Sequence, residues 1–438
     1  MNITQQPRPA KLKPSDLKAI AASAIGNCIE LFDLTVFGFF AAVIGAQFFP
    51  NDNPVTSTLS SFATFAIGFL MRPAGALLLA PIGDKFGRKQ LLSITMILMG
   101  LASLGIALLP GYAIIGWPAP VLLILFRLMQ GFAAGGEWGG AVSMMVEHAP
   151  ADKRGFIGSF QQVGFGLGIL AGTICSFLLN TYLSHEQVAG WGWRIPFFIG
   201  SVVTPLALYI RRNIEESPEF VAFERQGELP ARPLTEVFRY HYRGILCVIG
   251  IGTVGTAAGY IANQFMNNYA SGTLGMPMAR VSLLIMVASV LQTLLIPVWG
   301  WVSDKVGRVQ VIGGAALLYL ILIYPLFVLL SQHPSAFTLG LLVISCAILV
   351  SASFGPLPAL ISEFFPAHIR TTAISIGYNF AAALFGGCAP LISTWLISRT
   401  GNLISPTYYA IFCALISTIT AAVLFNQSRK LSATNKAA

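Results

Sequence analysis

Long apolar segments separated by short polar turns recur along the whole chain. Twelve of these segments are long enough to cross a bilayer as an α-helix, which takes about 20 mostly apolar residues. The predicted spans lie roughly at 19–48, 58–81, 91–109, 119–146, 155–182, 194–211, 244–270, 280–301, 309–331, 336–361, 371–396 and 405–425. Because a spanning backbone must satisfy its own hydrogen bonds, this pattern predicts an all-α polytopic membrane protein.

One long polar interval, 212–243, divides the predicted spans into two sets of six. We therefore expect an N-terminal six-helix bundle in residues 1–211, a cytoplasmic loop between the bundles in residues 212–243, and a C-terminal six-helix bundle in residues 244–438.

Two short stretches occur twice, about half a chain length apart. GDKFGRKQ at 83–90 returns as SDKVGRVQ at 303–310, and EHAPADKR at 147–154 returns as EFFPAHIR at 363–370. Two separate matches at nearly the same offset predict pseudo-symmetric halves that share one orientation and are related by an axis along the membrane normal.

Composition and charge placement narrow the class of protein. Only 10% of the 438 residues are charged and 55% are hydrophobic, whereas a soluble domain has about 25% charged residues. The net charge of +9 suggests a nucleic-acid partner, but 21 of the 26 Lys and Arg residues fall on one side of the predicted spans and only 3 on the other. This bias predicts that both termini are cytoplasmic, and it argues against nucleic-acid binding.

The repeated DKxGR motif places an acid and an arginine at the ends of neighbouring helices. The glycine permits a tight turn, and the acid is positioned to bind the arginine or to cap the next helix. We predict a cytoplasmic gate that breaks when the halves rock, although a plain basic turn accounts for the same residues. The predicted gate residues are Asp84, Arg88, Asp304 and Arg308.

Together with these motifs, several stretches resemble the major facilitator superfamily, and more narrowly its metabolite:proton symporter family. They are GNCIELFDLTVFG (26–38), FLMRPAGALLLAPIGDKFGRK (69–89), RLMQGFAAGGEWGGA (127–141), ADKRGFIGSF (151–160), WGWRIPF (191–197), EESPEF (215–220) and EFFPAHIR (363–370). The resemblance implies a multi-pass protein of the bacterial inner membrane. It also implies that the protein carries an organic acid, shikimate, proline or a betaine together with protons.

Five ionisable residues lie inside the predicted spans, and all belong to the first half: Glu30, Asp33, Arg72, Arg127 and Glu137. A charge at the bilayer centre costs about 2.5–3.5 kcal/mol, so such residues usually serve a function. Glu30 and Asp33 share one helix face, and two nearby carboxylates in a low dielectric do not both ionise cheaply. We predict that Glu30, Asp33, Arg127 and Glu137 couple transport to protons.

Each of these charges also has a structural alternative. Arg127 is similar to an arginine that pairs with a helix-1 carboxylate in sugar:proton relatives, so we expect an Asp33–Arg127 pair that either couples protons or only fixes helix register. Glu137 is either a second proton station or a buried strut. Arg72 either attracts an anionic substrate or neutralises Glu30 or Glu137.

Neutral polar residues inside the spans complete the predicted binding site. Four of them follow an i, i+3, i+4, i+7 stripe on the seventh span, as expected for one helix face lining a path. Each also has an alternative role in holding helices together. With Arg72, the predicted substrate-binding residues are Gln161, Gln162, Tyr260, Asn263, Gln264, Asn267, Gln292, Tyr378 and Asn379.

The preferred function is proton-coupled import, by alternating access, of a small organic anion such as a mono-, di- or tricarboxylate. The alternative substrate is a zwitterion such as proline or a betaine, and a non-transporting membrane sensor ranks behind both. We expect no enzyme activity, cofactor or metal site, and a monomer whose partners are its substrate, protons and the lipid bilayer.

Overall fold

The computed structural model describes residues 12–52 and 54–437. Over these residues the regular secondary structure is entirely helical, and twelve helical segments are long and apolar enough to cross a membrane. The prediction of an all-α fold with twelve spans is therefore confirmed.

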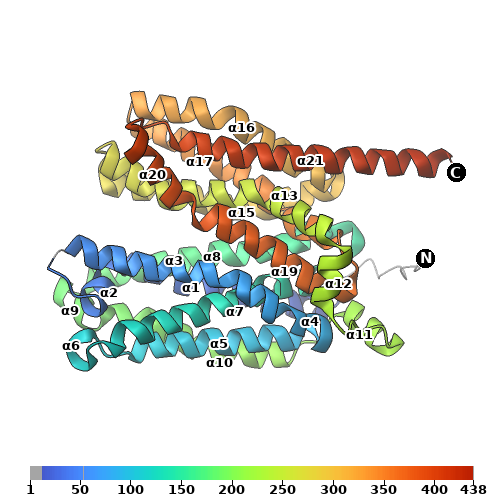
Figure 1. Cartoon of the computed structure of the whole chain (residues 1–438), viewed down its shortest axis with the longest axis horizontal. Coiled ribbons are helices and arrows are strands. Elements are labelled where there is room, and N and C mark those ends of the chain that lie inside the picture. Colours follow the sequence, from blue (N-terminus) through green and yellow to red (C-terminus); the bar gives the residue numbers. More distant parts are fainter. Residues whose placement is uncertain (1–11, 53, 438) are drawn as a thin grey trace.

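The helices of the first half form one bundle (Figure 1). They are α1 (Pro14–Phe39), α2 (Ala41–Phe48), α3 (Pro54–Leu78), α4 (Ala80–Phe86), α5 (Arg88–Leu108), α6 (Tyr112–Ile115), α7 (Pro118–His148), η1 (Ala151–Lys153), α8 (Arg154–Tyr182), α9 (His185–Gly190), η2 (Gly192–Arg194) and α10 (Ile195–Arg212). Two short helices, α11 (Pro218–Gln226) and α12 (Pro233–Tyr240), connect this bundle to the next.

The helices of the second half form a second bundle beside the first (Figure 1). They are α13 (Tyr242–Tyr260), η3 (Ile261–Phe265), α14 (Met266–Asn268), η4 (Tyr269–Thr273), α15 (Met278–Val306), α16 (Arg308–Gln332), α17 (Ala336–Phe354), α18 (Leu357–Ser362), η5 (Ala367–Ile369), α19 (Arg370–Ala381), η6 (Ala382–Gly387), α20 (Ala389–Thr400) and α21 (Pro406–Ala437). Between the bundles, α15 packs against α8, while α19 packs against α3 and α7.

One end of the two bundles carries most of the polar connections. Here α1 begins, α21 ends, and α11 and α12 cross between the halves (Figure 1). The turns at this end carry Lys85, Arg88, Lys89, Lys153 and Arg154. We call it the basic face, and we call the other end the opposite face.

The seventh span departs from a regular α-helix, because two π-helical segments, η3 and η4, interrupt it. Tyr260 meets Phe69 of the first half edge to face, with ring centroids 5.6 Å apart. Asn263 accepts a hydrogen bond from Ser289 of α15 at 2.7 Å. The four residues of the predicted stripe are all less than fully buried, whereas the residues between them at 261–262 and 265–266 are buried. The burial pattern agrees with one shared face, and the role of that face in lining a path stays a prediction.

Glycines let α3 and α7 pack with their backbones nearly touching. A Cβ atom added at Gly131 would overlap the carbonyl oxygen of Gly68, and one added at Gly135 would overlap that of Arg72. Contacts between small residues are a main source of helix association in lipid, where water does not drive the packing. The close approach places Arg127 of α7 beside Gly68 of α3, and Arg72 of α3 beside Gly135 of α7.

Gly131→Ala is expected to destabilise the fold by about 1–3 kcal/mol, because the added methyl group would push against a backbone carbonyl. The measurement is the apparent unfolding temperature of the purified protein in detergent. Gly38→Ala is the matched control, since no atom lies within 4 Å of a Cβ added there. Equal unfolding temperatures for the two variants would contradict the packing described here.

Candidate functional site

The interior of the first bundle holds a ladder of charges along one face of α1. Glu30 forms a buried ion pair with Arg72 of α3. Asp33, one turn further along α1, is also buried and accepts a hydrogen bond from Ser103 of α5. The predicted neutralisation of Glu30 by Arg72 is therefore present.

The expected direct pair between Asp33 and Arg127 is not formed, because Gln130 lies between them. Arg127 donates from Nη1 to Oε1 of Gln130 at 2.6 Å, and Nε2 of Gln130 points to Oδ2 of Asp33 at 3.4 Å. The Arg127 guanidinium also lies over the Phe37 ring, 4.3 Å from its centroid. Gln130 was missed because a neutral side chain carries no charge signal, although its i+3 spacing from Arg127 places both on one helix face.

Glu137 has a partner at the end of the sixth span that was not predicted to be one of the charges inside the bundle. Both guanidinium Nη atoms of Arg211, in the last turn of α10, donate to the Glu137 carboxylate, and Thr95 donates to it as well. Arg211 is fully buried. A Cβ added at Gly26 of α1 would overlap both members of this ion pair, so the missing side chain makes room for it.

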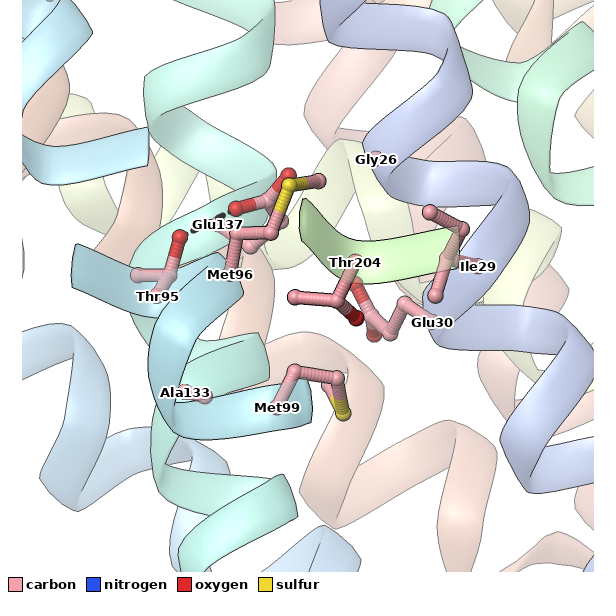
Figure 2. A pocket seen from close by; sticks show the side chains of 9 residues that line it. All are labelled: Gly26, Ile29, Glu30, Thr95, Met96, Met99, Ala133, Glu137 and Thr204. Carbon is pink, nitrogen blue, oxygen red and sulfur yellow. Dashed lines mark hydrogen bonds between the residues drawn. The ribbon is translucent and has the colours of Figure 1, made fainter. Parts of the chain in front are cut away.

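Two small cavities connect these charges. Figure 2 shows the first, which Glu30 and Glu137 line together with Gly26, Thr95 and Met99. The second is lined by Glu30, Asp33, Arg72, Met99, Arg127 and Gln130, among others. Each has a volume of about 10 Å³, which is the room that one water molecule needs. Since Glu30 lines both, water in the two cavities would connect Asp33 to Glu137 through Glu30.

The interface between the halves brings together another part of the predicted set. The Tyr378 ring stacks on Trp138 of α7 with centroids 3.5 Å apart. Asn379 donates from Nδ2 to the carbonyl oxygen of Gly135 at 2.9 Å, so it links α19 to α7. Gln161 is fully buried, and neither polar atom of its amide has a partner among the described residues.

Three other predicted binding residues are less buried than Gln161, Tyr378 and Asn379. Gln264 is exposed, while Asn267 and Gln292 are half-buried. Trp138, which the sequence analysis did not single out, belongs to the interface cluster, and its only sequence signal was an aromatic residue between two glycine pairs.

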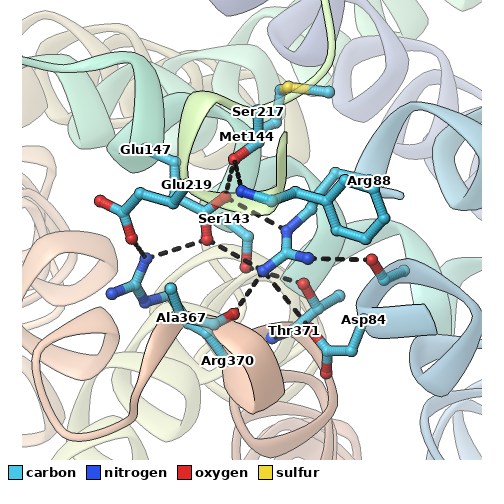
Figure 3. Close-up of polar contacts among 12 residues, drawn as sticks. Asp84, Arg88, Ser143, Met144, Glu147, Ser217, Glu219, Ala367, Arg370 and Thr371 are labelled. Atoms are coloured by element: carbon cyan, nitrogen blue, oxygen red, sulfur yellow. Dashed lines mark hydrogen bonds and ion pairs between the residues drawn. The ribbon is translucent and has the colours of Figure 1, made fainter. Parts of the chain in front are cut away.

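The basic face is closed by contacts between the halves (Figure 3). Asp84, at the end of α4, accepts the backbone N–H groups of Thr371 at 3.2 Å and Thr372 at 2.8 Å. Arg88 holds this carboxylate from the other side at 3.5 Å. Because the first N–H groups of a helix lack internal partners, an acid of the first half here caps α19 of the second half.

The repeated motif makes the reciprocal contact. Asp304, near the end of α15, accepts the backbone N–H groups of Gly155 at 2.8 Å and Phe156 at 2.9 Å, at the start of α8. Arg308 pairs with Asp304 at 3.0 Å. Each acid was expected either to bind its neighbouring arginine or to cap the next helix in the chain. Both acids bind their arginines, and the helix that each one caps belongs to the other half.

Glu147 extends the closure and was not in the predicted gate. It accepts from Arg88 at 3.2 Å and from Arg370 at 2.9 Å, and Ser217 of the connecting segment donates to it. Arg370 also pairs with Glu219 of α11. The second repeat and the EESPEF stretch contained these residues, but only the folded chain brings them to Arg88 (Figure 3).

Glu216 ties the connecting segment to the start of α5. Its carboxylate accepts the backbone N–H groups of Arg88 and Lys89, both at 3.0 Å. Burial raises the pKa of Glu216, and the backbone donors, together with the Arg88 charge, oppose this. Burial outweighs these donors, so protonation of Glu216 is easier while the connecting segment is docked than it would be in water.

Comparisons with known proteins agree with this architecture. Residues 18–237 match the family described as "Sugar (and other) transporter", and residues 244–438 match "Major Facilitator Superfamily". A putative proline/betaine transporter of Staphylococcus haemolyticus is 36% identical over 93% of this chain and 87% of that protein. The citrate-proton symporter of Salmonella typhi is 34% identical over 99% of this chain and all (100%) of that one.

Solved structures show the same fold. The proton:xylose symporter XylE bound to 6-bromo-6-deoxy-D-glucose matches with a TM-score of 0.72 and 17% identity, over 94% of this chain and 95% of that one. XylE from E. coli in an inward open conformation matches with a TM-score of 0.63 and 19% identity, over the same shares. The class defined by fold and site is thus a multi-pass membrane transporter rather than an enzyme. The chain belongs to the major facilitator superfamily, as its motifs predicted.

Asp84→Asn is expected to loosen the start of α19, because an amide retains a single acceptor oxygen and no charge. Losing such a cap costs about 1–2 kcal/mol, which corresponds to amide hydrogen exchange about five- to thirtyfold faster over residues 370–375. The measurement is hydrogen–deuterium exchange followed by mass spectrometry. Asp152→Asn, at an exposed acid of η1, is the control and should exchange as the parent does. Unchanged exchange in Asp84→Asn would argue against the cap.

Proposed function

We propose that the protein is a proton-coupled symporter that imports a small organic anion, such as a mono-, di- or tricarboxylate, by alternating access. The observation that carries this proposal is the row of buried carboxylate sites in the first bundle, joined by two cavities of one-water size. Its relatives support it, since one of them is a citrate-proton symporter that matches along nearly the whole chain.

The proton route begins at Asp33 and runs towards the basic face. Oδ1 of Asp33 and Oε2 of Glu30 have no hydrogen-bond partner among the described residues, so each is open to a proton or a water molecule. Glu137 follows one cavity further on, paired with Arg211. Since α7 runs towards the basic face and Glu137 follows Arg127 by ten residues, the route descends about 15 Å along that helix. In this role Arg127 acts on Asp33 through Gln130.

The Glu30–Arg72 pair couples the proton to the substrate. The Arg72 guanidinium lies over the Phe69 ring, 5.1 Å from its centroid, and Phe69 meets Tyr260 of the second half. Protonation of Glu30 releases Arg72 from its ion pair, and an arginine left unpaired in a low dielectric gains strongly from binding a carboxylate. An anionic substrate and a proton therefore bind together, which is the requirement for symport. We propose that Gln161 and Gln162 hydrogen-bond the same ligand.

A zwitterion such as proline or a betaine is the second candidate, and the aromatic side chains at the interface favour it. Phe69 faces Tyr260, and Trp138 stacks on Tyr378. Rings of this kind attract quaternary ammonium groups through their electron-rich faces. A relative named as a proline/betaine transporter supports this alternative to the same degree as the citrate relative supports the first.

The distribution of basic residues supports an orientation of the protein in its membrane. The 21-to-3 bias of Lys and Arg supports a cytoplasmic basic face, with both termini and the connecting segment inside the cell and the spans in the bacterial inner membrane. In this orientation the described conformation is closed to the cytoplasm by Asp84, Arg88, Asp304 and Arg308. We propose a monomer whose two halves, 1–211 and 244–438, rock about the binding interface.

Asp33→Asn is expected to abolish accumulation of the substrate while leaving substrate exchange intact, because an amide cannot take up and release the coupled proton. With one proton per cycle a monocarboxylate crosses without net charge, so a pH difference of one unit supplies about 1.4 kcal/mol, or about tenfold accumulation, and this is what the variant loses. Uptake and counterflow in proteoliposomes separate the two activities. Asp52→Asn, at an exposed acid between α2 and α3, is the matched control. Accumulation by Asp33→Asn equal to that of the parent would exclude Asp33 as the proton site.

The substrate class is tested by thermal stability of the purified protein with citrate, succinate, lactate, proline and glycine betaine, at pH 6 and pH 7.5. A ligand at 100 times its Kd stabilises the folded protein by about 2.7 kcal/mol. We expect stabilisation by a carboxylate that is stronger at pH 6, where Glu30 protonation is easier, and that is lost in Arg72→Gln but kept in Arg399→Gln. Stabilisation by glycine betaine or proline alone would reject the organic-anion assignment and support the zwitterion.

A further inference from the structure

A compact surface at the junction of α12 and α13 combines aromatic rings with arginines. We call it the junction surface; its five exposed side chains are Phe238, Arg239, Tyr240, Tyr242 and Arg243. The proton route, the binding interface and the closure of the basic face leave it unused. The other side of α12 is occupied, because Pro233 and Val237 are buried. The helix is therefore anchored on one side and open on the other.

A second contact fixes the position of α12 on the basic face. The Glu236 carboxylate is hydrogen-bonded to Nε2 of His368, at 2.7 Å, in the η5 turn before α19. The helix also packs against α4 of the first bundle and α19 of the second, so it lies across the boundary between the halves (Figure 1). The junction surface is thus held by fixed helices on both sides rather than carried on a loose loop.

The junction surface lies at the level of the membrane boundary. The seventh span begins at Tyr242, and Leu246, one turn further in, is 62% exposed. An exposed leucine inside a span faces acyl chains, and Tyr242 precedes it by four residues on the same side of the helix. Tyrosine side chains concentrate at this depth, where the ring is in an apolar layer and the hydroxyl reaches water. Arg243, next to Tyr242, is then at headgroup depth.

The two arginines of the junction surface are oriented but not neutralised. Arg239 lies over the Tyr240 ring at 5.6 Å, and Arg243 lies over the Tyr242 ring at 5.8 Å. Arg243 also donates from Nε to the Tyr242 hydroxyl at 3.2 Å. Within 12–52 and 54–437, neither arginine has an ion pair with an acid. Stacking on rings costs an arginine little hydration and leaves its outer N–H groups free to meet a phosphate.

We propose that the junction surface binds the headgroup phosphate of an anionic phospholipid. The guanidinium groups of Arg239 and Arg243 supply charge-assisted hydrogen bonds to the phosphate oxygens. Tyr240 and Tyr242 enclose the glycerol region, and an acyl chain lies along Leu246. The positive charge of the site complements the lipid, and its depth in the membrane matches a lipid rather than a soluble anion.

The test is titration of the detergent-purified full chain with dioleoylphosphatidylglycerol or dioleoylphosphatidylcholine, followed by the apparent unfolding temperature. We expect the anionic lipid to raise that temperature for the parent, and the neutral lipid to raise it less. The Arg239→Gln/Arg243→Gln double variant should need about thirtyfold more phosphatidylglycerol for half the effect, since each arginine near an anionic headgroup contributes about fivefold. Both positions are exposed, so the variant should unfold as the parent does without lipid.

The matched control removes the same charge from the same connecting segment. Arg225→Gln/Arg232→Gln changes two exposed arginines that lie over no ring, and it should respond to phosphatidylglycerol as the parent does. An equal loss in this control would mean a diffuse charge effect and would overturn the proposal. Equal stabilisation by both lipids would overturn it as well, and so would an equal effect of inorganic phosphate, which would indicate a site for soluble anions.

Discussion

Burying a carboxylate inside a membrane-spanning bundle costs desolvation free energy, and many contacts of this structure supply the partners that offset it. Three acids inside the spans of the first half each meet their own donor: Glu30 meets Arg72, Asp33 meets Ser103 and Gln130, and Glu137 meets Arg211. Such pairs are weak sources of stability, because desolvation offsets most of their attraction. An exchange of partners during the proposed transport cycle would account for their presence on α1 and α7.

The two halves divide the chemistry between them. Inside the first bundle the polar groups are charged and connected, whereas the second half contributes aromatic rings and amides at the interface, among them Tyr260, Tyr378 and Asn379. Arg72 belongs to both sets of groups, since it pairs with the Glu30 carboxylate of the first half and lies near Tyr260 and Tyr378 of the second. Under the proposed mechanism, a change in the protonation of Glu30 becomes a change in the charge that Arg72 offers at the interface.

The sequence predicted those features that depend on length and apolarity. The twelve spans and the charges deep inside them follow from hydropathy, and the repeat shows directly in the letters. Arg211 was not predicted to be a buried charge because it stands beside Arg212 at a polar boundary, and hydropathy does not report which side of a helix faces inward. The partners of Asp84 lie nearly 290 residues further along the chain, so no local pattern indicates them.

The two halves make equivalent contacts with each other where the basic face is closed. Asp84 and Asp304 occupy equivalent places in the repeat, and so do the helix starts that they cap, at 371–372 and 155–156. Each half therefore caps a helix of the other half with the acid of the same motif, as two identical subunits do across an isologous dimer interface. A single half-length unit would form this closure with its own copy across a two-fold axis, so the fused chain retains, in one molecule, the geometry of a homodimer.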